Sequence, residues 1–189
     1  MKRRNAEMGV GTLIIFIALL LVAAVAAGVL IQTAGSLQQK ALSTGTQATS
    51  QISTNAIVLE VSATDGRSTG TLDNFSMIMK LAPGSDSIKL DDVTLTFSTT
   101  NSTQTLTYDG ALTSGTTTNF AVSYLQTGPN NQTGVIVRGD VIQVNLQSSR
   151  AMVESEDVRI NFIPKIGTST LVEFYMPDVI STERVYLYP

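Results

Sequence analysis

The apolar positions follow two different patterns along the chain. Residues 9–31 are almost continuously apolar, and apolar residues then recur at helical spacing as far as Ile52. We therefore expect one long helix over about residues 10–53, apolar on all sides in its first half and along a single stripe in its second. From Ile57 onward apolar and polar residues alternate, which is the period of a β-strand.

The alternating part predicts short strands separated by turn signals. Gly139-Asp140 lies between two of these runs and predicts a tight hairpin, and Pro83-Gly84 and Gly167 mark other turns. Many short strands with regular turns are typical of a β-sandwich. The predicted fold class is therefore α+β, a long N-terminal α-helix followed by an all-β immunoglobulin-like sandwich. Strands are expected at residues 57–63, 74–81, 93–98, 104–108, 119–125, 135–138, 141–146, 158–163, 171–176 and 184–188.

The apolar tract is long enough to cross a membrane. As a helix it is roughly 33 Å long, against about 30 Å for the hydrocarbon core of a bilayer. Lys2, Arg3 and Arg4 precede it and favour a cytoplasmic N-terminus, and no charged residue lies between Glu7 and Lys40. The tract exceeds the apolar length of an ordinary cleaved signal peptide.

Composition excludes several classes of function. The chain has 12 Lys and Arg against 15 Asp and Glu, so no basic surface for nucleic acid is expected. It contains no Cys and no His, which removes disulfides, thiolate metal sites and every mechanism that needs a histidine base. A single-pass membrane anchor with an external domain and a bundle of packed helices both remain open. Glycines at 9, 11, 28 and 35 favour close helix packing, because each weakens a helix interior.

The longest run of informative residues is MGVGTLIIFIALLLVAAVAAGVLIQTAGSLQQKA, residues 8–41. It resembles the N-terminus of archaeal flagellins (archaellins), which belong to the type IV pilin-like superfamily, nearly residue for residue. LDNFSMIMKLAPGSD (72–86), IPKIG (163–167), VEFYMP (172–177) and VYLYP (185–189) resemble the outer domain of the same family. The resemblance thus spans most of the chain and is strongest over residues 8–42.

The resemblance implies a secreted structural subunit of the archaeal flagellum (archaellum). A prepilin-peptidase-like enzyme would remove residues 1–6 as a class III signal peptide by cutting between Ala6 and Glu7, where Ala6 replaces the family's usual Gly. Residues 7–53 would form the filament-core helix and residues 54–189 the outer β-sandwich. The residues expected in the filament core are Gly11, Leu13, Ile14, Phe16, Ile17, Leu20, Leu21, Ala24, Ala27, Gly28 and Ile31.

The implied partners are other copies of the chain or paralogous subunits, the peptidase, the motor and platform proteins of the archaellum, and the membrane before assembly. The mature location would be the extracellular filament, used for swimming. An archaeal type IV adhesion pilin is the alternative, although bacterial-type pilins carry a glutamate inside the apolar stretch and this chain has none there. A membrane-anchored enzyme or receptor is the third class, and the absence of His and Cys speaks against it.

Two kinds of polar site remain. Asn74, Asn101 and Asn131 each begin an Asn-X-Ser/Thr sequon, and we expect N-glycosylation there, although Asn74 falls at the start of an expected strand. No cofactor is expected. Acidic clusters offer carboxylates for a structural Ca²⁺, but solvated turns explain them more simply because no EF-hand spacing is present. These clusters comprise Asp91 and Asp92, and Glu154, Glu156 and Asp157.

Overall fold

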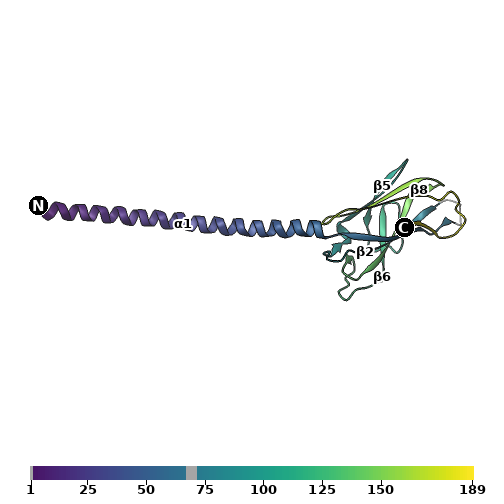
Figure 1. Ribbon diagram of the computed structural model, residues 1–189, viewed down its shortest axis with the longest axis horizontal. Coiled ribbons are helices and arrows are strands. Elements are labelled where there is room, and N and C mark those ends of the chain that lie inside the picture. Colours follow the sequence, from purple (N-terminus) through teal and green to yellow (C-terminus); the bar gives the residue numbers. More distant parts are fainter. Residues whose placement is uncertain (1, 67–71) are drawn as a thin grey trace. The chain divides into compact units, whose positions relative to one another are not determined.

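A computed structural model describes residues 2–66 and 72–189 of the chain (Figure 1). The chain divides into two compact units, Met1–Ala48 and Thr49–Pro189. The first is helical, and the second contains the last helical turn and all the strands.

The structure contains one long helix, α1, at Lys2–Ser53, and one 3₁₀ turn, η1, at Leu90–Asp92, among the described residues. The strands are β1 Ala56–Ala63, β2 Leu72–Leu81, β3 Ile88–Lys89, β4 Val93–Thr99, β5 Thr103–Tyr108, β6 Asn119–Gln126, β7 Val135–Ile136, β8 Val141–Met152, β9 Asp157–Pro164, β10 Thr170–Tyr175 and β11 Val185–Tyr188.

Helix α1 ends at Ser53, as the sequence predicts, but it begins about two turns earlier than expected. Gly9 and Gly11 lower the helix propensity of this region without interrupting the backbone hydrogen bonds, so the helix continues through them to Lys2. The chain contains no proline before Pro83, and nothing in α1 therefore forces a break.

Nine strands form one hydrogen-bonded sheet in the order β10-β9-β4-β5-β6-β8-β2-β1-β11. β5 and β6 run parallel, and the other neighbouring strands are antiparallel. The sheet folds over on itself, because the rings of Phe75 on β2 and Phe97 on β4 lie 5.1 Å apart although three strands separate them in the sheet. At the two ends of the sheet, the Thr170 hydroxyl on β10 donates to the carbonyl of Ala56 on β1 at 2.8 Å.

The folded sheet encloses an apolar core. Burial alternates in β8 from Val141 to Ser148 and throughout β9. Residues that face inward from both layers, such as Phe75, Met77, Phe97 and Phe162, are almost completely buried. This confirms the predicted fold class, a long N-terminal helix followed by an all-β sandwich.

The expected hairpin at Gly139-Asp140 is wrong. β7 pairs with β3 in a separate two-stranded sheet, with Ile136 opposite Ile88, rather than with β8. Both edges of β8 are already occupied, by β2 and β6. Gly139 adopts φ of 89°, and Asp140 closes the turn by accepting a hydrogen bond from the Val137 N–H at 3.0 Å, so the chain changes direction without pairing β7 to β8.

Phe97→Ala tests this core. Phe97 is 1% exposed, and its removal should lower the free energy of unfolding by about 3–5 kcal/mol through lost burial and the cavity left behind. The control Thr96→Ala, on the opposite face of the same strand, should cost less than about 1 kcal/mol. Thermal unfolding of the full chain in detergent, followed by β-sheet circular dichroism, measures both. Equal effects would contradict the assigned inward face of β4.

Candidate assembly surface and modification sites

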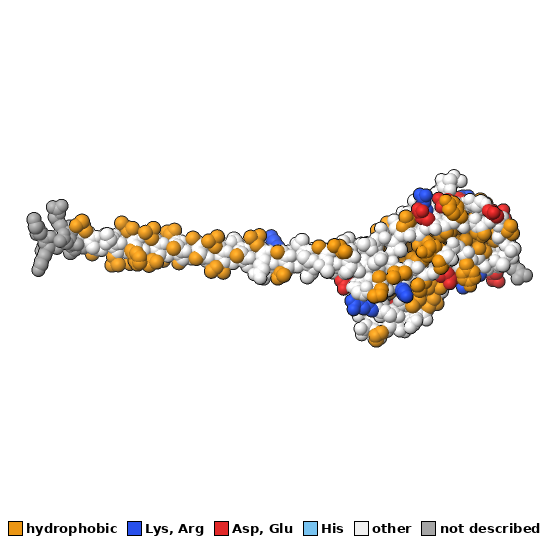
Figure 2. Space-filling model, in the orientation of Figure 1, with side chains coloured by type: hydrophobic (Ala, Val, Ile, Leu, Met, Phe, Trp, Pro, Cys, Tyr) orange, Lys and Arg blue, Asp and Glu red, His pale blue; other side chains and the backbone are white. Residues whose placement is uncertain are grey.

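The residues expected in the filament core are exposed in the single chain. Leu13, Phe16, Leu20 and Ile31 are 56%, 59%, 53% and 74% exposed, and apolar side chains are visible along α1 in Figure 2. Burying one such side chain lowers the free energy of the protein by about 1.5–3 kcal/mol relative to leaving the side chain in water. A row of these residues on one helix therefore requires a covering surface.

Four glycines of α1 face open space in the described part of the chain. A Cβ atom built on Gly9, Gly11, Gly28 or Gly35 would have no atom within 4 Å apart from the local helix backbone. Each glycine in a helix interior costs roughly 0.5–1 kcal/mol relative to alanine. Close approach by another helix is a physical reason to keep glycine at such positions.

The hydroxyl groups of α1 are compatible with burial. Thr12, Thr33, Ser36 and Thr46 each donate a hydrogen bond to the backbone carbonyl three residues earlier, at 2.9–3.0 Å. A hydroxyl that is satisfied inside its own helix needs no water when the helix is packed. These four hydroxyls therefore do not prevent their part of α1 from entering an apolar environment.

Length and composition would let α1 cross a bilayer, from Met8 onward. A single such helix near the N-terminus is weak evidence for a permanent anchor, because secretory signals meet the same test. Ala6 and Glu7, the expected processing residues, lie within the span of α1, but their side chains are outside the described part of the chain. The cut between them stays a prediction.

Two of the three sequon asparagines lie in exposed turns. Asn101 is at the tip of the β4–β5 hairpin, whose turn is closed by the Ser102 N–H donating to the Thr99 hydroxyl at 3.1 Å. Asn131 follows β6, and its N–H bonds to the Gly128 carbonyl at 3.3 Å. Both side chains are exposed, so a glycan on either would meet solvent.

Asn74 is also exposed, but it lies in a strand rather than in a turn. It lies within β2, which is paired on both sides, and its side-chain amide donates to the Asp65 carboxylate at 3.1 Å. Ser76, the third residue of the sequon, is buried. Burial raises the pKa of the neighbouring Asp73 carboxyl, and the charge of Asp65 raises it further. Sequence reasoning missed Asp65 because its contacts with residues 73 and 74 depend on the fold.

Asp140 holds together the loop that carries Asn131. It is 1% exposed, and its two carboxylate oxygens accept hydrogen bonds from the Gly128 N–H at 2.6 Å and the Val137 N–H at 3.0 Å. A buried carboxylate needs such donors to offset its desolvation. The sequence showed this residue only as part of a turn, and no local signal indicated that it joins both ends of the loop.

Two members of the acidic cluster near β9, Glu156 and Asp157, form ion pairs with neighbouring arginines. The buried Glu156 pairs with Arg150, and Arg159 pairs with Asp157 at 3.5 Å and with Glu173 at 3.1 Å. Over residues 2–66 and 72–189, no three acidic side chains are grouped as metal ligands. Bound Ca²⁺ therefore stays a prediction without support from the geometry.

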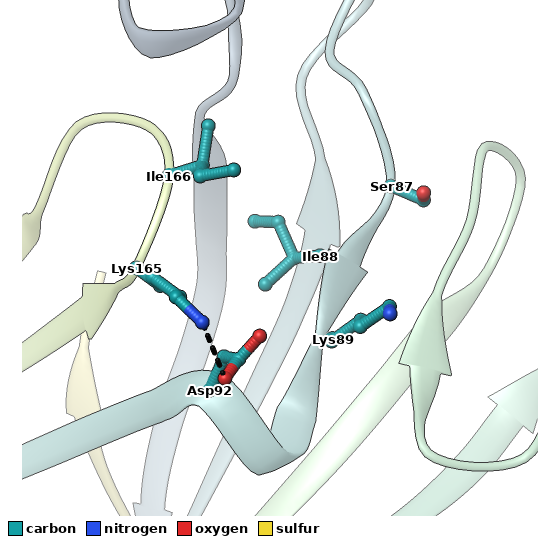
Figure 3. Close-up of a pocket in the computed structure, with 6 residues that line it drawn as sticks. All are labelled: Ser87, Ile88, Lys89, Asp92, Lys165 and Ile166. Carbon is teal, nitrogen blue, oxygen red and sulfur yellow. Dashed lines mark hydrogen bonds and ion pairs between the residues drawn. The ribbon is translucent and has the colours of Figure 1, made fainter. Parts of the chain in front are cut away.

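The second acidic cluster borders a shallow pocket (Figure 3). Asp92 pairs there with Lys165 at 3.2 Å, while Ile88 and Ile166 line the same pocket. Both members of the ion pair are substantially exposed, so it contributes little to stability.

Comparison with known proteins extends the evidence beyond the geometry. The archaeal-type flagellin family profile matches residues 6–174. The chain belongs to the archaeal-type flagellin family. Flagellin B3 of Halobacterium salinarum is 33% identical over 95% of this chain and 93% of its own length, and flagellin A1 of Haloferax volcanii is 39% identical over 78% of this chain and 70% of its own.

Solved structures agree on the fold of this family member. The archaeal flagellum of Methanospirillum hungatei matches 95% of this chain and 98% of that chain with a TM-score of 0.73 and 20% identity. A crystal structure of an archaeal flagellin from Methanocaldococcus jannaschii covers 71% of this chain and 96% of that chain, with a TM-score of 0.65 and 16% identity. The family identifies the chain as a structural subunit of the archaeal flagellum, and no finding supports the adhesion-pilin alternative.

Mass spectrometry of native filaments tests the three sequons. Asn101 and Asn131 should carry glycan, and Asn74 should be occupied less because its amide is bonded to Asp65 within a paired strand. Asn101→Gln and Asn131→Gln should each remove one glycan mass, with Asn130→Gln as a control that leaves all three sequons intact. Three unmodified asparagines in the native filament would contradict the assignment.

Proposed function

We propose that this flagellin is a filament subunit whose helix, residues 7–53, is covered by the helices of other copies, while residues 54–189 form the outer surface of the filament. The observation that carries the proposal is the exposed apolar surface of α1, together with the open space beside its glycines at 9, 11, 28 and 35 in the described part of the chain. Family membership supports a structural and non-enzymatic role.

The membrane serves in this proposal as a reservoir. The lipid interior covers the first half of α1 as well as protein does, so moving it from lipid to a helix bundle gains little hydrophobic free energy. Close packing gains dispersion energy instead, which is small for each atom pair and large for many copies. Gly11, Ala24, Ala27 and Gly28 are the small residues that would allow this approach.

Polymerisation requires contacts that do not close on themselves. Subunits joined head to tail by a heterologous interface form an open helix when the rotation between them does not close a ring. Other copies of this chain, or paralogous flagellins, are the proposed neighbours in that helix. The proposed location of the assembled subunit is outside the cell, attached to the archaellum motor and platform proteins for swimming.

Processing precedes assembly. We propose that a prepilin-peptidase-like enzyme removes residues 1–6, together with the basic residues Lys2, Arg3 and Arg4. Loss of these three charges would release the N-terminus from the cytoplasmic face, because charged residues cross the hydrocarbon core at high cost. The support is the basic leader followed directly by the apolar tract.

N-terminal sequencing of the subunit from shed filaments tests the cut. The first residue should be Glu7. An Ala6→Gly variant, which carries the residue usual in the family, should give the same N-terminus, whereas an intact Met1 or a cut within the apolar tract would contradict the proposal.

Charge substitution tests the covered helix. Ala24→Glu and Leu20→Arg should each prevent stable filaments, because a charge in the centre of an apolar helix costs about 2.5–3.5 kcal/mol even in a membrane. Gln39→Glu is the matched control, since residue 39 lies about 200° from Leu37 and from Ala41 around the helix, opposite the apolar stripe. Electron microscopy of shed material scores assembly, and the membrane fraction shows whether each variant still inserts. Intact filaments from Ala24→Glu or Leu20→Arg would refute the core assignment.

A further inference from the structure

The connection between the last helical turn and the sandwich is short, and its backbone groups are hydrogen-bonded. Only Thr54 and Asn55 separate α1 from β1. The Thr54 N–H bonds to the Ser50 carbonyl at 3.1 Å, and the Thr54 carbonyl accepts from the Thr168 N–H at 2.9 Å. The Asn55 N–H bonds to the Ser85 hydroxyl at 3.0 Å, and the Asn55 carbonyl accepts from the Ala82 N–H at 2.9 Å. All four backbone groups of the connection are therefore satisfied by protein.

Ser85 is the central residue of this connection. It is completely buried, and its hydroxyl donates toward the carbonyls of Ser53 at 3.2 Å and Asn55 at 3.0 Å while accepting from the Asn55 N–H. The Pro83-Gly84 turn, with Gly84 at φ of 88°, brings it to this position. Ser85 thus joins the last residue of the helix to the first residues after it.

Two further contacts hold the same place. Gly167, at φ of 115°, packs so closely that a Cβ atom on it would lie 2.5 Å from the Thr54 carbonyl oxygen. The Ser50 hydroxyl in the last helical turn donates to the Asp86 carboxylate at 2.8 Å. We refer to Ser50, Thr54, Asn55, Ser85, Asp86 and Gly167 as the collar.

The collar is more elaborate than a covalent connection requires. A flexible linker would join a helix to a sandwich without buried hydroxyls or a glycine forced against the backbone. In a rotating filament, viscous drag acts on the outer surface, whereas the packed helices form the continuous core. If the chain rotated freely at Thr54, the outer domains would move under this drag without transmitting the force to the helices.

We propose that the collar, with Ser85 as its positioning residue, fixes the last helical turn to the sandwich and in this way contributes to the bending stiffness of the filament. This inference rests on the proposed function, because it requires the helix to lie in the filament core. It assigns to Ser85 a mechanical role distinct from folding of the sandwich and from polymerisation.

The test compares Ser85→Ala with Ser148→Ala in filaments of the full chain. Ser148 is also a buried serine, 5% exposed, whose hydroxyl bonds to backbone at Arg150, but it lies in the part of β8 that pairs with Asn74, away from the collar. Both variants lose one buried hydroxyl, so their thermal unfolding should shift by similar amounts. Only Ser85→Ala removes hydrogen bonds of the collar. It should therefore raise about fivefold the population of molecules in which the hydrogen bonds of the collar are broken.

Persistence length, measured from the contours of shed filaments in electron micrographs, is the readout. The proposal expects Ser85→Ala filaments to assemble and to have a shorter persistence length than parent and Ser148→Ala filaments, beyond the variation among filaments. Equal persistence lengths in the three would overturn it. If Ser85→Ala does not assemble, Ser50→Ala, which removes only the peripheral bond to Asp86, decides by the same measurement, and unchanged stiffness there overturns the proposal. Failure of the parent chain to form filaments would instead contradict the proposed function.

Discussion

The structure depends on one constraint, which is that the apolar surface of α1 cannot remain in water. Residues from Val10 to Ile31 present large apolar side chains that nothing in the described part of the chain covers. The sandwich buries its own apolar residues and has no such requirement. The helix must therefore associate with lipid or with other helices, and both family membership and the open space beside its glycines favour other helices as the final surroundings.

The two halves of the helix meet this constraint differently. The first half is apolar on all sides and suits burial among several neighbours, whereas the second half has one stripe and an otherwise uncharged polar surface interrupted only by Lys40. Hydroxyls bonded within the helix reduce the cost of burying this polar surface. At its end, the helix passes directly into the collar, and only Thr54 and Asn55 separate it from the first strand of the sandwich.

The spacing of apolar residues in the sequence was sufficient to predict most of the helix and strand positions. The end of α1 was predicted at about residue 53 and the start of β4 at Val93, and both agree with the structure because each coincides with a change in apolar spacing. β3 was missed because a strand of two residues is too short to show an alternating pattern. β8 continues beyond Leu146 to Met152 through Ser148, Ser149 and Arg150, where apolar and polar residues no longer alternate. The pairing partners of the strands were harder to predict than the positions of the strands along the chain. The β7–β3 pair and the Asp65–Asn74 contact join residues distant in sequence, and neither leaves a local pattern.

The central claim is tested most directly by a three-dimensional reconstruction of shed native filaments at a resolution that shows side chains. The account predicts that residues 7–31 of each copy are surrounded by the helices of other copies, with neighbouring backbones closest near Gly11 and Gly28. Helices enclosed by lipid, or filaments in which this segment is absent from the interior, would contradict it.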